Sequence, residues 1–181
     1  MDFSKRDIHG LKIIAGSAIA LVIVAVFGLI AGGPNLDSNN CIIGETHKNV
    51  VLLLDNTDSF SANQKANLLG LAERLQNDLE INDRLTIYVM SENSSFSPLP
   101  SLSICRPASG ADTNPFTGNP DKVQEVFEER FANLIDEIFR ETPKVAGAHR
   151  SPIIEFIEGI VSNLASNGIF EISEFIVVSD L

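Results

Sequence analysis

The sequence predicts an α/β protein with a doubly wound, mostly parallel sheet, preceded by one transmembrane helix. An uncharged aliphatic run lies near the N-terminus, and the remainder alternates short continuous apolar runs with amphipathic stretches of helical spacing. Continuous apolar runs are typical of strands that are covered on both faces, and their alternation with helices is typical of parallel sheets.

Residues 13–31 are the predicted transmembrane helix. These 19 residues carry no charge. As a helix they would span about 28 Å, close to the hydrocarbon thickness of a bilayer. A cleaved signal peptide is the alternative, because basic residues precede the run and small residues follow it. The apolar part of a signal peptide is usually only about 7–15 residues long, which favours an uncleaved anchor.

The distribution of charge predicts which side of the membrane the domain occupies. Three basic residues lie within residues 1–12, and the next one along the chain is Lys48. The positive-inside rule therefore places residues 1–12 in the cytoplasm and residues 32–181 on the periplasmic or extracellular side. Residues 32–181 contain 10 basic and 22 acidic residues. Such a net negative charge disfavours binding to nucleic acid or to anionic lipids.

Residues 32–47 begin with a polar, turn-rich stretch and are predicted to be a tether. The two cysteines, Cys41 and Cys105, both follow the apolar run. In an oxidising compartment they would form one disulfide bond, and two unrelated thiols are the alternative. Without a nearby cluster of histidines in the sequence, the pair does not indicate a zinc site.

The predicted α/β domain comprises residues 48–181. Its first strand is the apolar run of residues 49–54, which stops at Asp55, and a second strand follows over residues 84–90. Between them a helix is expected over residues 62–80. Its apolar face consists of Leu68, Leu71, Ala72, Leu75 and Leu79.

The second half of this domain begins with a long loop. Residues 91–120 are rich in Ser, Pro, Asn and Gly and lack periodicity, so they are expected to be functional or disordered. A helix is predicted from Pro120 to Pro143, with proline at its first position, and another over residues 152–164. A last strand over residues 174–179 leads to Asp180.

Two of the predicted strands thus end in an aspartate, and parallel α/β sheets bind ligands beyond the carboxyl ends of their strands. In Asp55-x-Thr57-x-Ser59 a carboxylate and two hydroxyls follow one strand. Hard divalent cations such as Mg²⁺ prefer these oxygen ligands. An ordinary helix N-cap is the alternative explanation of the motif.

Three segments resemble the metal-ion-dependent adhesion site (MIDAS) of the von Willebrand factor A-type (VWA) domain. VLLLDNTDS, with Asp55, Thr57 and Ser59, is similar to its first part. HRSPII is similar to its second part, with Ser151 where threonine is usual. FIVVSDL is similar to its third part, with Asp180 followed by leucine instead of glycine. The pair Asp83-Arg84 also resembles the start of that family's next strand.

The resemblance covers roughly residues 48–181 and implies a VWA or Rossmann-like fold with a metal site. Thr57, Ser59 and Ser151 would approach the ion, whereas Asp55 and Asp180 would act directly or through water. Mg²⁺ is the expected cation, with Mn²⁺ or Ca²⁺ as alternatives. The open coordination position would accept an acidic group from a protein partner.

In that family the domain continues past the third part, whereas this chain ends one residue after Asp180. We therefore expect either that the C-terminal part of the domain is missing or that the fold is completed in another way, and that the site is incomplete or weakened.

The leading functional hypothesis is a membrane-anchored binding module, not an enzyme. The alternatives are a metal-dependent hydrolase of the same fold class and a structural interaction domain with a vacant site. His149, Ser151 and Asp180 could suggest a Ser–His–Asp hydrolase, but no nucleophile elbow accompanies them. A haloacid dehalogenase would require an aspartate at the position of Thr57.

Overall fold

The computed structural model describes residues 5–30, 34–45, 47–57, 60–91, 98–142 and 152–179. The chain divides into two compact units, Met1–Asn35 and Leu36–Leu181.

The first unit contains one long helix, α1 (Lys5–Ile30). Its described apolar side chains are exposed over the stretch from Ile13 to Val26; Leu21, for example, is 71% exposed. Over the residues that the structure describes, no helix combines the length and the apolarity that a membrane span requires.

The second unit is built on a four-stranded mixed sheet with the strand order β3-β2-β1-β4. The central strand β1 (Asn49–Asp55) pairs in parallel with β2 (Arg84–Met90) and with β4 (Glu174–Val178). The short strand β3 (Leu102–Cys105) pairs antiparallel with β2. The predicted α/β class is confirmed.

The expectation for residues 91–120 was wrong in part, because β3 and a 3-10 turn (Gly110–Asp112) lie within them. Four residues are too few to show a periodicity, and the pairing with β2 is what makes this segment a strand. Residues 92–97 lie outside the described part of the chain.

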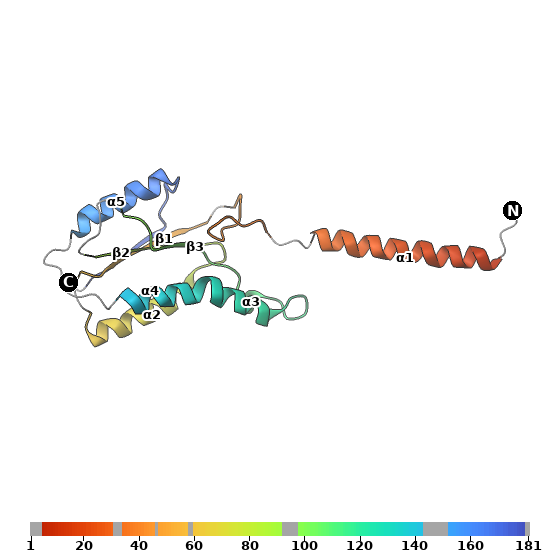
Figure 1. The fold of residues 1–181 in the computed structure, drawn as a ribbon, viewed down its shortest axis with the longest axis horizontal. Coiled ribbons are helices and arrows are strands. Elements are labelled where there is room, and N and C mark those ends of the chain that lie inside the picture. The colour runs from red at the N-terminus through yellow and green to blue at the C-terminus, as the bar shows by residue number, and fades with distance from the viewer. Residues whose placement is uncertain are drawn as a thin grey trace. The chain divides into compact units, whose positions relative to one another are not determined.

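Helices cover both faces of the sheet, as the doubly wound prediction requires (Figure 1). One face carries α2 (Ala62–Asp78), α3 (Pro120–Phe127) and α4 (Asn133–Glu141), and the other carries α5 (Ile153–Ser166). Successive residues of β1 point to opposite faces. Leu52 and Leu54 therefore enter the core under α2 and α4, and Leu53 enters the core under α5. This two-sided burial explains the continuous apolar run of β1.

The long helix predicted before Pro143 is interrupted by a π turn, Glu128–Ala132, between α3 and α4. The buried residues Phe127, Phe131, Ile135 and Phe139 recur at intervals of four. An α-helix turns by about 400° over four residues, so such a stripe drifts around the axis. The wider π turn compensates for the drift and keeps the stripe on the sheet.

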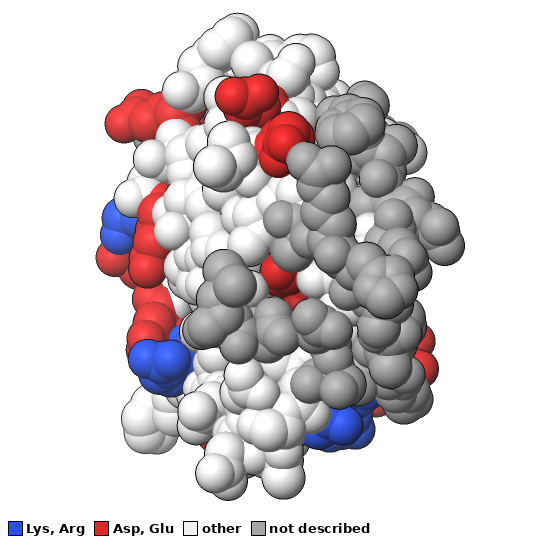
Figure 2. All heavy atoms as spheres, turned by 90° about the vertical axis from the view of Figure 1, so that its left-hand side faces the viewer, with Lys and Arg blue, Asp and Glu red and all other residues white. Residues whose placement is uncertain are grey.

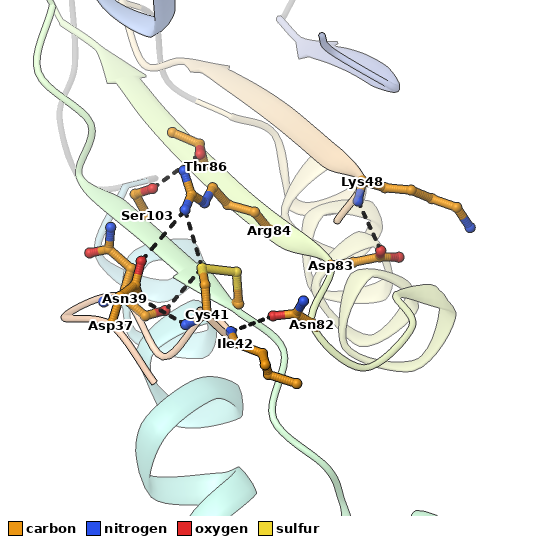
Figure 3. The surroundings of a disulfide bond; sticks show 11 residues. Asp37, Asn39, Cys41, Ile42, Lys48, Asn82, Asp83, Arg84, Thr86 and Ser103 are labelled. Atoms are coloured by element: carbon orange, nitrogen blue, oxygen red, sulfur yellow. Dashed lines mark hydrogen bonds and ion pairs between the residues drawn. A yellow bond between two sulfur atoms is a disulfide. The ribbon is translucent and has the colours of Figure 1, made fainter. Parts of the chain in front are cut away.

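The predicted disulfide between Cys41 and Cys105 is present, with 4.9 Å between the two Cα atoms. It joins the segment before β1 to the end of β3 (Figure 3). Residues from Leu36 onward, within the stretch expected to be a tether, belong to the second unit. Asp37 Oδ1 holds them in a turn by accepting the backbone N–H groups of Asn39 and Cys41 at 2.8 and 2.9 Å.

Candidate metal centre

The candidate site lies at the carboxyl end of β1, where the strand emerges from the two-sided core. Asp55 is the last residue of β1 and is only 1% exposed, and Asn56 and Thr57 are each 3% exposed. The N–H of Asn56 donates to the carbonyl of Met90 at 2.8 Å, which extends the β1–β2 pairing by one residue. The hydrogen bonds of the sheet thus fix the backbone that carries the side chains of this site.

Asp55 and Thr57 form a closed pair within the turn. Asp55 Oδ1 accepts the backbone N–H of Thr57 at 3.1 Å and the Thr57 hydroxyl at 2.7 Å. Because the hydroxyl proton points to Asp55, the lone pairs of Thr57 Oγ1 point away from that carboxylate. A hydroxyl in this orientation presents lone pairs that a cation can use.

The adjacent strand β4 brings a further hydroxyl to the same carboxylate. Ser179 follows β4 directly, and its Oγ donates to Asp55 Oδ2 at 3.0 Å. The parallel register places Leu54 opposite Val178, so the next residues along the two strands, Asp55 and Ser179, meet at the sheet edge. The described site is therefore a buried carboxylate that holds hydroxyls from two chain segments 124 positions apart.

Of the predicted ligands, Asp55 and Thr57 are brought together by the structure. The other three, Ser59, Ser151 and Asp180, lie outside the described residues.

Sequence reasoning missed two residues at this edge. In the sequence Ser179 is only a residue of the predicted strand that leads to Asp180, and the parallel register of β1 and β4 is what places it beside Asp55. Asn56 has a buried side-chain oxygen with no hydrogen-bond partner among the described residues. No local pattern marks an unpartnered acceptor, because its burial depends on the packing around the strand end.

The candidate site lies at the end of the domain that holds the carboxyl end of β1. Figure 2 faces this end, and acidic groups cover more of the visible surface than basic ones do, one of them near the centre of the view. A cation approaching this end is attracted by the surrounding charge.

Comparisons with protein-family models, with curated proteins and with solved structures found no match for this chain.

The described oxygen atoms of the site suit a hard divalent cation as ligands. They are carboxylate and hydroxyl oxygens, the ligand types that Mg²⁺, Mn²⁺ and Ca²⁺ prefer. Asp55 is oriented by Thr57 and Ser179, so that its oxygens are held in fixed directions. Such outer hydrogen bonds are what positions a carboxylate for an ion.

Proposed function

We propose that this protein is a membrane-anchored VWA-like domain that binds a protein partner through a divalent cation on the extracytoplasmic side. The ion would be held at the end of β1 by Asp55 and Thr57, together with Ser59, Ser151 and Asp180. Its open position would accept a carboxylate from the partner. The observation that carries this proposal is the buried Asp55 carboxylate with the Thr57 and Ser179 hydroxyls directed to it.

The charge of the chain supports a cation as the bridge. Residues 32–181 contain more than twice as many acidic as basic residues. An acidic group of a partner would be repelled by this surface unless a bound cation neutralised the contact. Affinity for an acidic partner should therefore vanish when the metal is removed.

Binding is a better account of the site than catalysis. The described groups coordinate and orient, since a carboxylate with two hydroxyls directed to it offers cation ligands and no poised general acid. A hydrolase of the same fold class would turn over phosphate or ester substrates in a manner that depends on Asp55 and Asp180.

The anchor in this proposal is α1. Apart from Ser17, its described side chains between Ile13 and Val26 are apolar and exposed, within an uncharged run that continues to Ala31. Basic residues precede this run, and the disulfide of the second unit is of a kind that persists in oxidising compartments. Membrane vesicles with the cytoplasmic face inward test the orientation, because protease added outside should digest residues 32–181. Vesicles that receive no protease should release no soluble domain, since the anchor is not cleaved.

Calorimetry with Mg²⁺ or Mn²⁺ on the full chain in detergent micelles tests the metal site. We expect one bound ion per chain for the natural sequence and no saturable binding for Asp55→Ala. Ser179→Ala should bind more weakly by about tenfold, because it removes a group that orients the ligand and not the ligand itself.

Asp78→Asn is the matched control, because Asp78 is an exposed carboxylate at the end of α2. It should bind the ion as the natural sequence does. Equal binding by the natural sequence and Asp55→Ala, with both variants folded by circular dichroism, would refute the site. Chelator-resistant binding of partners would favour the structural interaction domain instead.

A further inference from the structure

His47 lies beside the disulfide, just before the start of β1, whereas Asp55 lies at the other end of that strand. The two sulfur atoms and one imidazole nitrogen of His47 all lie within 4.8 Å of one another. Cys41 and Cys105 are 2% and 0% exposed. The sequence did not indicate this group, since Cys105 follows His47 by more than fifty residues.

The imidazole of His47 has an unused ring nitrogen. Its Nδ1 is buried and has no hydrogen-bond partner among the described residues. Leaving a buried polar atom unpaired costs about 1–3 kcal/mol. A neutral imidazole nitrogen without a hydrogen-bond partner is also the form in which histidine binds a metal.

The sulfur atoms of a disulfide are weak ligands, whereas thiolates bind zinc strongly. We propose that reduction of the Cys41–Cys105 bond converts this cluster into a zinc site formed by two thiolates and the His47 imidazole. A dithiol reductant on the extracytoplasmic side, where the proposed function places the domain, supplies the two electrons. The protein disulfide becomes two thiols as the dithiol closes to its own disulfide, and zinc binding then releases the two thiol protons.

The geometry of the cluster suits a tetrahedral zinc ion. With Zn–S bonds of about 2.3 Å and a Zn–N bond of about 2.0 Å, neighbouring ligand atoms are separated by about 3.5–3.8 Å. The three ligand atoms already lie within 4.8 Å of one another. On reduction the sulfur atoms must separate from their bonded distance and the imidazole nitrogen must settle at about 3.5 Å from them, and the fourth position is left for water or a fourth ligand.

Arg84 supports the charge of such a site. Its Nη2 lies 3.3 Å from Cys41 Sγ and 3.8 Å from Asp37 Oδ2 (Figure 3). A guanidinium at this distance stabilises a thiolate, and Asp37 keeps the guanidinium in place.

Hydrogen bonds donated by backbone N–H groups hold the ligand-bearing segments together independently of the S–S bond. The N–H of Cys105 donates to the carbonyl of Asn39 at 2.8 Å, and the N–H of Ile42 donates to Asn82 Oδ1 at 2.7 Å. Arg84 N–H donates to the carbonyl of Lys48 at 2.8 Å, which fixes the segment that carries His47. The ligands therefore stay close after reduction.

Zinc content of the full chain in detergent micelles tests the proposal. The chain is compared oxidised and after reduction with a phosphine, which does not compete as a thiol, and excess zinc is removed by dialysis. We expect one zinc ion per chain in the reduced form and none at this cluster in the oxidised form. Because the chain has only two cysteines, the thiolate-to-metal absorption of the cobalt-substituted form reports on this site alone.

Three variants separate a built site from adventitious binding. His47→Gln keeps the disulfide and should lose the zinc of the reduced form, and Arg84→Gln should bind zinc about tenfold or more weakly. Lys48→Gln, at the neighbouring exposed residue, should bind normally. Zinc should also raise the melting temperature of the reduced natural sequence but not that of reduced His47→Gln. Absence of zinc from the reduced protein, or equal zinc in His47→Gln, would overturn the proposal, and neither result bears on the Asp55 site.

Discussion

Asp55, Tyr88 and Arg84 show how single polar residues are accommodated in a sheet that is buried on both faces. Each is matched to a partner from a different segment: the Ser179 hydroxyl for Asp55, the Asn163 side chain for Tyr88 and the Cys41 sulfur for Arg84. A buried polar group without such a partner would lower the stability of the folded state. The positions of these partners therefore decide which chemistry each residue can perform.

Tyr88 gives a prediction at the residue scale, because it is the only tyrosine of the chain and no tryptophan is present. Burial raises the pKa of its phenol from 10.0 to about 12. The unfolded chain loses the phenol proton near its ordinary pKa, whereas the folded chain keeps it. The stability that Tyr88 contributes is therefore complete below pH 10 and is lost as the pH rises toward 12.

Ultraviolet absorbance of the phenolate, with circular dichroism as the check on folding, measures this titration directly. In the folded protein the midpoint should lie well above that of the urea-unfolded chain. Tyr88→Phe should show less loss of stability between about pH 10 and pH 12, and a stability at neutral pH lower by about 1 kcal/mol because it loses the bond to Asn163. Identical midpoints in the folded and unfolded chain would contradict the buried phenol.

At the scale of elements, the π turn between α3 and α4 is coupled to α2 by one side chain. Gln76 Nε2 donates to the carbonyl of Ala132 at 3.3 Å and to Asp136 Oδ1 at 2.7 Å. The π turn is thus held from outside its own helix. Helix α2 depends in turn on a capping box, in which Ser61 and Gln64 satisfy each other's backbone N–H groups.

Gln76→Ala should lower the free energy of unfolding by about 1–2 kcal/mol, because two hydrogen bonds are lost and the Ala132 carbonyl loses a donor. Urea unfolding at neutral pH measures the change. Asn77→Ala, at the adjacent exposed amide, serves as the control and should change stability by less than about 0.5 kcal/mol. Equal effects of the two substitutions would mean that Gln76 does not hold the π turn.

At the scale of the whole molecule, the disulfide connects residues that are 64 positions apart and links the segment before β1 to the edge strand β3. A crosslink of this kind stabilises the folded state mainly by restricting the unfolded chain. Its removal should therefore affect the entire second unit and not only the segment before β1.

Replacing both cysteines by serine should lower the free energy of unfolding by about 4 kcal/mol, the loop entropy for a closed loop of this length. Denaturant unfolding of the natural sequence and of Cys41→Ser/Cys105→Ser, both in the presence of a chelator, measures the difference. The chelator excludes any stabilisation by zinc. A loss below about 1 kcal/mol would show that the unfolded chain is not restricted by the bond.

The order and type of the long elements could be predicted from the sequence because their signals are local. The run from Asn49 to Leu54 is continuously apolar, and the leucines of α2 recur at helical spacing. Strand β3 could not be predicted, since four residues with ordinary composition become a strand only by pairing with β2. Likewise, the predicted continuous helix before Pro143 gave no sign of the π turn, which depends on the sheet beneath it.

The same distinction applies to the two candidate sites. By itself, the sequence determined that Asp55 and Thr57 stand at the end of a buried strand, and that two cysteines are available for a bond. Only the tertiary structure decided that Ser179 meets Asp55 and that His47 lies beside Cys41 and Cys105. The physical reason is that these contacts join segments far apart along the chain. Such contacts are specified by the register of the strands and by the packing of the core, which no local pattern contains.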